Sequence, residues 1–151
     1  NIFGPHQSLR AIIPSIISQI IKKEKFLVLG NLKPTRDFTY VKDTCFAFEK
    51  FVNSKVLPGE IINIGSDTNI SIGELAKKII LLMGSKIKIK TSNYKKRKKN
   101  TEVDYLRCEN SYSLKKLRWK PKYSLEDGLK ETIDWYLENY KKFYGSDTFK
   151  K

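Results

Sequence analysis

Apolar residues along this 151-residue chain alternate between helical spacing and short strand-like runs, and this alternation limits the fold more than any other feature. Residues 10–23 carry isoleucines at helical spacing, with Pro14 tolerable in the first turn. Residues 26–30 have the pattern of a buried strand ended by glycine, residues 36–41 that of a second strand, and residues 43–54 that of a helix. Helices and strands that alternate in this way predict an α/β or α+β protein.

The same alternation continues through the second half of the chain. Residues 60–65 are rich in isoleucine and predict a buried strand, whereas residues 86–90 alternate strictly and predict a half-exposed strand. Between them, Ser71 and Glu74 have the spacing of a capping box, which opens a helix that ends near Met83.

Two further helices are expected toward the C-terminus. Residues 113–117 suggest a short helix, and Ser124 with Asp127 forms a second capping box that opens a long amphipathic helix to about Tyr140. The apolar face of that helix would consist of Leu129, Ile133, Trp135, Tyr136 and Leu137. Residues 145–151 are expected to form a frayed tail.

The length and the cysteine content are those of one soluble domain. A chain of 151 residues matches the rough scale of about 100–200 residues per domain. No apolar run approaches the roughly 20 residues of a membrane span, no signal peptide is visible, and the two cysteines are too few for a disulfide framework. These observations predict a cytoplasmic protein. The sequence starts at Asn1 and its one methionine is Met83, so we expect a piece of a longer protein.

The net charge of +14, from 30 basic and 16 acidic residues, has two interpretations. Such a surplus favours polyanion binding and the steering of anions, but a lysine-rich surface also serves solubility alone. Arginine is more informative, because its planar guanidinium group binds phosphate through two hydrogen bonds at once. We therefore give weight to the five arginines, which are Arg10, Arg36, Arg97, Arg107 and Arg118.

Common cofactor and metal motifs do not occur in the sequence. The eight glycines never have the spacing of a dinucleotide-binding or P-loop motif, and one histidine with two distant cysteines forms no metal cluster. Two Tyr-x-x-x-Lys pairs, which begin at Tyr94 and Tyr112, have the spacing used by short-chain dehydrogenases. We attribute both to coincidence in a chain with eight tyrosines and many lysines, and we interpret His6 as a turn residue.

Two basic features remain open when the residues are taken alone. Residues 94–99 form a basic loop that matches no nucleic-acid-binding motif, so we expect a solvated loop in which Arg97 does specific work. Arg36 precedes Asp37, which could hold its guanidinium group or cap the turn. A surface ion pair contributes at most about 1 kcal/mol, whereas a charge-assisted hydrogen bond to phosphate contributes roughly 1.5–3 kcal/mol.

The order of short motifs favours phosphate. The strings NIFGPHQ, IPSIISQI, FLVLG and RDFTYVKD are followed by GEIINIGS, SIGELA, RKKNTEV and LRWKPKYSLEDGLKETIDWY. In this order they resemble the C-terminal part of the extended short-chain dehydrogenase/reductase family, which comprises the nucleotide-sugar epimerases and 4,6-dehydratases. The likeness runs unbroken from Asn1 to about Tyr140. It looks closest to the 4,6-dehydratases that act on UDP-N-acetylglucosamine in nonulosonic (legionaminic-type) acid pathways.

The resemblance implies a C-terminal fragment of a Rossmann-type α/β enzyme. Residues 1–40 and 66–144 would form the small substrate-binding domain, and residues 41–65 would be the last helix and strand of the NAD-binding domain. NAD would be bound mainly by the preceding part of the enzyme, and the full-length parent would be a homodimer. The strand at residues 61–64 would lack its neighbours in the isolated chain, so we expect poor solubility or self-association.

The resemblance also implies substrate-binding residues, and it places no catalytic residue in this chain. Arg36 would bind the diphosphate and Arg97 would bind it from a second side, so that the sugar is held in position. The other implied contacts are Asn1 and Asn63 near the phosphates, Ile13, Pro14, Leu27 and Leu29 beside the nucleotide base, and Glu102 at a ribose or loop. The sequence departs from the family pattern at Lys98, where proline is usual, and at His6, where arginine is common.

We therefore expect part of an NAD-dependent nucleotide-sugar 4,6-dehydratase. Such a lyase oxidises C4 of the sugar, eliminates water across C5–C6 and returns the hydride to C6. The expected partner is a nucleotide-diphosphate sugar, with no nucleic acid and no membrane, and the chain alone should be catalytically inert. A 4-epimerase or a decarboxylase of the same family is the alternative enzyme. A basic nucleic-acid-binding module is the alternative of another class, and its affinity would fall steeply with salt.

Overall fold

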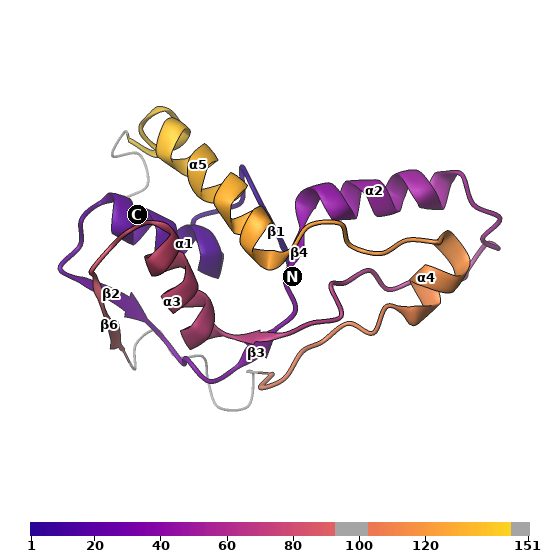
Figure 1. Ribbon diagram of the computed structural model, residues 1–151, viewed down its shortest axis with the longest axis horizontal. Helices are drawn as coiled ribbons and strands as arrows, with labels where there is room; N and C mark the ends of the chain where they lie inside the picture. The colour runs from indigo at the N-terminus through magenta and orange to yellow at the C-terminus, as the bar shows by residue number, and fades with distance from the viewer. Residues whose placement is uncertain (93–102, 146–151) are drawn as a thin grey trace.

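The computed structural model describes residues 1–92 and 103–145, in which helices and strands alternate as in an α/β protein (Figure 1). The strands form two-residue or four-residue pairs: β1 (Ile2–Phe3) with β4 (Thr39–Tyr40) and β2 (Phe26–Leu29) with β6 (Lys88–Thr91) in parallel, and β3 (Thr35–Arg36) with β5 (Ile70–Ser71) antiparallel. The helices are α1 (Ile12–Ile21), α2 (Val41–Val52), α3 (Ile72–Leu82), α4 (Ser111–Leu117) and α5 (Leu125–Tyr144).

One region, which we name the helical lobe, consists of α1, α3 and α5 with the strand pairs β1–β4 and β2–β6. Helix α1 packs against both α3 and α5, and in Figure 1 α5 lies above α1 and α3, with β2 and β6 at the lower left. Their isoleucines, leucines and aromatic residues form one continuous core, which includes Ile16, Leu75 and Leu129 with no exposed surface. Burying one such aliphatic side chain contributes about 1.5–3 kcal/mol to stability, so this core holds the lobe together.

Helix α5 approaches the strands closely because it carries a glycine on its buried face. A Cβ atom at Gly128 would lie 2.8 Å from the ring of Phe3 and 2.9 Å from the ring of Tyr40. The buried face of α5 continues through Leu129, Ile133 and Tyr136, as the sequence predicted. Leu137 was expected on this face, but it is 58% exposed, because it lies one position beyond the buried stripe.

The other region, which we name the arm, consists of α2, residues 53–64, α4 and residues 118–120, and it extends away from the helical lobe (Figure 1). Its buried apolar cluster contains Ala47, Leu117 and Trp119. The predicted strand at residues 60–65 is wrong: these residues form no strand, and Ile61 is 81% exposed. A parallel strand needs neighbours that accept and donate its backbone hydrogen bonds, and no described residue provides them here.

Most other sequence predictions are confirmed, with shifts at the boundaries. The capping box of Ser71 and Glu74 opens α3, and the Ser124 side chain caps α5. The single strand predicted at residues 36–41 is divided into β3 and β4, because each part pairs with a different strand and the helix α2 already begins at Val41. Within the described residues, no helix has both the length and the apolar character needed to cross a bilayer. The expected tail at 145–151 lies outside them except for its first residue.

Candidate functional site

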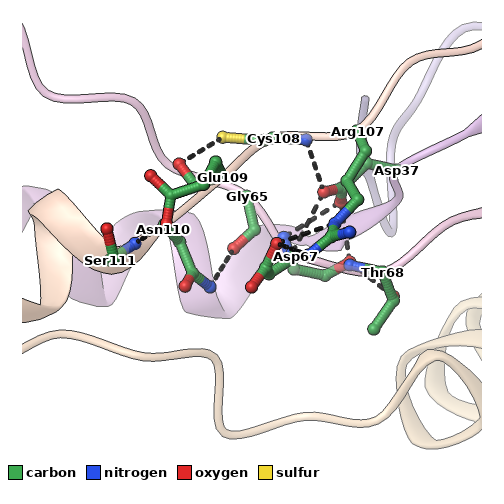
Figure 2. A network of polar contacts seen from close by, with 10 residues as sticks. Asp37, Gly65, Asp67, Thr68, Arg107, Cys108, Glu109, Asn110 and Ser111 are labelled. Atoms are coloured by element: carbon green, nitrogen blue, oxygen red, sulfur yellow. Dashed lines mark hydrogen bonds and ion pairs between the residues drawn. The ribbon is translucent and has the colours of Figure 1, made fainter.

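Asp37 is a buried carboxylate that fixes three chain segments around the end of β3 (Figure 2). Its Oδ1 accepts hydrogen bonds from the Ser66 backbone N–H at 2.9 Å and from the Ser66 hydroxyl at 2.7 Å. Its Oδ2 accepts from the backbone N–H groups of Asp67 and Cys108, both at 3.1 Å. Asp37 therefore does not bind the guanidinium group of its neighbour but immobilises the backbone that carries it.

Arg36 is held in a backbone that is bonded on both sides. Its strand pairs with β5, and the preceding Thr35 donates its N–H to the carbonyl of Asp104 at 2.8 Å and accepts from the N–H of Leu106 at 3.2 Å. The Arg36 Nη1 donates to the Thr35 carbonyl at 2.8 Å, which leaves other guanidinium N–H groups for a ligand. None of the ion pairs within residues 1–92 and 103–145 involves Arg36.

A cavity of about 580 Å³ opens beside Arg36, between the start of α1, the end of β2 and the segment that leads into β3. Its polar lining comes from Asn1, Gln7, Arg10, Ser15, Asn31 and Arg36. Its apolar lining comes from Leu9, Ile12, Ile13, Val28, Leu29, Pro34, Phe38 and Ile72. The only titratable side chains among these described lining residues are two guanidinium groups. The cavity therefore suits binding of an anion beside an apolar ring, and it holds no acid or base for proton transfer.

One asparagine and one glutamine side chain at the cavity are held by hydrogen bonds to backbone carbonyls. The Asn1 Nδ2 donates to the Asp37 carbonyl at 3.0 Å, and the Gln7 Nε2 donates to the Ile2 carbonyl at 2.8 Å. The hydroxyl of Tyr136, a buried residue of α5, donates to the carbonyl of Gln7. Burial raises the pKa of Tyr136, so this hydroxyl keeps its proton. The bond from Tyr136 connects the cavity-lining residue Gln7 to the core of the helical lobe.

The structure brings four of the nine predicted substrate-binding residues to this one cavity, namely Asn1, Ile13, Leu29 and Arg36. Pro14 and Leu27 are buried within α1 and β2, and neither lines the cavity. Asn63 lines a different cavity of about 460 Å³ in the arm, between α2 and residues 60–64. Arg97 and Glu102 lie outside the described residues.

Arg10 lines the cavity together with Arg36, and it was not among the predicted substrate-binding residues. It precedes Ala11, the N-cap residue of α1, which caps the helix without a side-chain hydrogen bond. The available signal was its residue type: it is one of only five arginines in a chain in which lysine supplies most of the positive charge.

Tyr112 and Lys116 both contact Glu60 in the arm, and they lie outside the main cavity. We name these three residues the Glu60 tether. The Tyr112 hydroxyl donates to Glu60 Oε1, and the Lys116 Nζ lies 2.7 Å from the same oxygen. The Lys116 ammonium group, followed by the Tyr112 hydroxyl and the N–H of Leu57, lowers the pKa of Glu60 from 4.5 to about 2. A carboxylate that binds both side chains explains their helical spacing without any catalytic role.

Comparison with known proteins agrees with the motif order. Residues 1–132 match the family model described as GDP-mannose 4,6 dehydratase. The chain is 38% identical to the dTDP-D-glucose 4,6-dehydratase of Homo sapiens in an alignment 149 residues long, which covers 93% of this chain and 40% of that protein. It is 36% identical to the UDP-N-acetyl-alpha-D-glucosaminuronate decarboxylase of Bacillus cytotoxicus in an alignment 143 residues long, which covers 91% of this chain and 44% of that protein.

A solved relative shows the same fold. The crystal structure of dTDP-glucose 4,6-dehydratase from Bacillus anthracis, in complex with NAD, superposes with a TM-score of 0.85 at 28% sequence identity, over 96% of this chain and 44% of that chain. The chain thus spans less than half the length of the relatives that it matches.

Proposed function

The chain belongs to the GDP-mannose 4,6 dehydratase family of NAD-dependent epimerases and dehydratases, and from this we propose that it binds the nucleotide and the diphosphate of a nucleotide sugar for an NAD-dependent 4,6-dehydratase. The observation that carries the proposal is Arg36, an arginine with no described ion pair, fixed at the wall of a 580 Å³ cavity. A guanidinium group in a rigid backbone suits a phosphate, because the charge-assisted bonds form without further ordering.

The size and the walls of the cavity support the same ligand class. Cavities that bind small molecules measure about 300–1,000 Å³, and they combine mainly apolar walls with a few polar groups. Here Ile13 and Leu29 provide apolar surface for a nucleobase, and Asn1 lies on the polar side with Arg36. Neither Ile13 nor Leu29 has a polar side chain that could select one nucleobase, so the choice between bases must come from hydrogen bonds to other groups.

We propose the dehydratase reaction in preference to the decarboxylase and 4-epimerase reactions of the same family. One relative at 38% identity is a 4,6-dehydratase and another at 36% is a decarboxylase, and a 4-epimerase is the third possibility. Product mass discriminates these reactions in the complete enzyme: a dehydratase product loses water, a decarboxylase product loses carbon dioxide, and an epimerase product keeps its mass. NAD is the proposed cofactor, since the solved dTDP-glucose 4,6-dehydratase is in complex with NAD.

We also propose a domain organisation for the complete enzyme, which would be a homodimer. Residues 1–40 and 66–144 would belong to its substrate-binding domain, and residues 41–65 would pack on its NAD-binding domain. The apolar surface of α2 and the segment after it supports this assignment, because Phe48 and Ile61 are exposed to solvent in the isolated chain. By itself the chain should bind the substrate without oxidising it.

The proposal is tested by measuring the binding of UDP-N-acetylglucosamine, dTDP-glucose, GDP-mannose and a DNA oligomer to the 151-residue chain by thermal shift and calorimetry. We expect one nucleotide sugar to bind, and Arg36→Gln to weaken it at least tenfold, because each charge-assisted bond contributes roughly 1.5–3 kcal/mol. The matched control is Arg118→Gln, which removes the same charge from an exposed position after α4. Binding of DNA alone, with a steep salt dependence, would overturn the proposal in favour of the nucleic-acid-binding alternative.

A further inference from the structure

We propose that Arg10 binds the diphosphate together with Arg36, and that this second guanidinium group makes the cavity selective for diphosphates over monophosphates. The inference rests on the proposed function, because it names a further specificity-determining residue of the same site. Its basis is that two arginines from separate elements line one cavity: Arg36 from β3, and Arg10 from the turn before α1.

The turn that carries Arg10 is bonded to itself. The Arg10 N–H donates to the Ser8 hydroxyl at 3.3 Å, and the Ala11 N–H donates to the Ser8 carbonyl at 2.9 Å. These bonds fix the backbone at residue 10 directly before the helix, so the side chain of Arg10 extends from a fixed point beside the cavity. Its long side chain is exposed, and no ion pair within the described residues involves it.

The first turn of α1 adds positive potential at the same wall. A helix carries the equivalent of about half a positive charge at its N-terminus, where the first backbone N–H groups have no partner in the helix. Here the N-cap residue Ala11 has no side chain that could accept from them, and the first-turn residues Ile12 and Ile13 line the cavity. The uncapped helix start therefore reinforces the two arginines.

The charge balance of the cavity calls for more than one negative charge. Two guanidinium groups line it, and none of its described lining residues is acidic. Like charges in one partly enclosed space repel each other, and an anion placed between them removes this repulsion. A diphosphate offers two separate phosphate groups, so that each arginine can form its own bidentate pair, whereas a monophosphate leaves one guanidinium group without a full partner.

The test compares diphosphates with monophosphates on the 151-residue chain by calorimetry, with the pairs UDP and UMP, dTDP and dTMP, and GDP and GMP. For the pair that binds most tightly, we expect the wild-type chain to bind the diphosphate at least tenfold more tightly than the monophosphate. Arg10→Gln should remove most of this preference. Arg10→Lys should keep part of it, because the charge remains while the planar fork is lost. Arg118→Gln should leave the ratio within twofold.

A merely structural role of Arg10 would change stability or both affinities alike, but it would not change their ratio. Thermal melting followed by circular dichroism verifies that each variant is folded. If Arg10→Gln keeps the wild-type preference while Arg36→Gln weakens nucleotide-sugar binding, the inference is wrong and the proposed function stands. If the wild-type chain binds neither nucleotides nor nucleotide sugars, both are wrong.

Discussion

The helical lobe and the arm are held together by different forces. In the helical lobe, apolar residues from α1, α3, α5 and the strands form one continuous buried core. In the arm, the buried apolar cluster is limited to Ala47, Leu117 and Trp119, while Phe48 is 67% exposed on the same helix as Ala47. The lobe can therefore obtain its stability from its own apolar burial, and the arm cannot do so to the same degree.

Two buried carboxylates bind backbone groups at the junction between the arm and the rest of the chain. Asp43, in the first turn of α2, accepts the backbone N–H groups of Lys122 at 2.8 Å and Tyr123 at 3.1 Å, and its carbonyl accepts from the Trp119 indole at 3.0 Å. Asp37 accepts the backbone N–H groups of Ser66, Asp67 and Cys108, which lie just outside the arm in the segments that lead out of residues 53–64 and into α4. Hydrogen bonds to a charged acceptor are stronger than neutral ones, so two aspartates compensate for a small apolar core.

The largest effect is expected from a substitution in the core of the helical lobe. Leu129→Ala should lower the free energy of unfolding by about 2–5 kcal/mol, because Leu129 is fully buried on α5 and its removal leaves a cavity. The matched control is Leu137→Ala on the same helix, which should change it by about 0.5 kcal/mol or less, since Leu137 is mostly exposed. Urea unfolding followed by circular dichroism measures both, and equal losses would contradict the proposed division.

The next largest effect is expected from a substitution that destabilises the arm and leaves the stability of the helical lobe unchanged. Asp43→Asn keeps one acceptor oxygen but turns an amide toward a backbone N–H, and we expect a loss of about 1–3 kcal/mol. The control Asp134→Asn makes the same exchange at an exposed position of α5. In a Trp135→Phe background, the fluorescence of Trp119 reports on the arm and circular dichroism mainly on the helices of the lobe. The two transitions should separate for Asp43→Asn only.

The sequence predicted those parts of the fold whose signal is local. The capping boxes at Ser71 and Ser124 identified the starts of α3 and α5, because the bonded partners lie three residues apart. The isoleucine pattern of residues 60–65 did not produce a strand, because strand formation depends on neighbours as well as on residue type. Asp37 and Asp43 look like ordinary turn and helix-start residues, and their roles depend on backbone groups tens of residues away.

The candidate site was predictable only in part, and by resemblance rather than by pattern. The motif order pointed to Asn1, Ile13, Leu29 and Arg36, which line one cavity. Nothing in the local sequence shows that the turn before α1 and the strand β3 face the same space, so Arg10 was missed. Conversely, Asn63 was expected near the same phosphates, at the end of a strand of the NAD-binding domain, but in the structure it lines the cavity of the arm.

A third prediction concerns the exposed apolar surface of the arm. If this surface causes self-association, the double variant Phe48→Ser and Ile61→Ser should shift the chain toward a monomer in sedimentation velocity experiments. Its stability should change little, about 0.5 kcal/mol per site, because both side chains are mostly exposed. Leu81→Ser is the control, since Leu81 is 79% exposed but belongs to α3 of the helical lobe. A wild-type chain that is already monomeric would contradict this prediction.

The smallest expected effect is the pH dependence of the Glu60 tether within the arm. Because the pKa of Glu60 is lowered to about 2 in the folded chain, its bond to Lys116 should stabilise the arm fully above pH 4.5 and be lost as the pH falls through about 2. An NMR titration of the Glu60 carboxyl carbon should show this midpoint. Lys116→Met should raise the midpoint toward 4.5, because Lys116 is the main cause of the shift. Lys115→Met, one position away on α4, should leave it unchanged, and an equal rise in both variants would mean that general positive charge rather than the direct contact lowers the pKa.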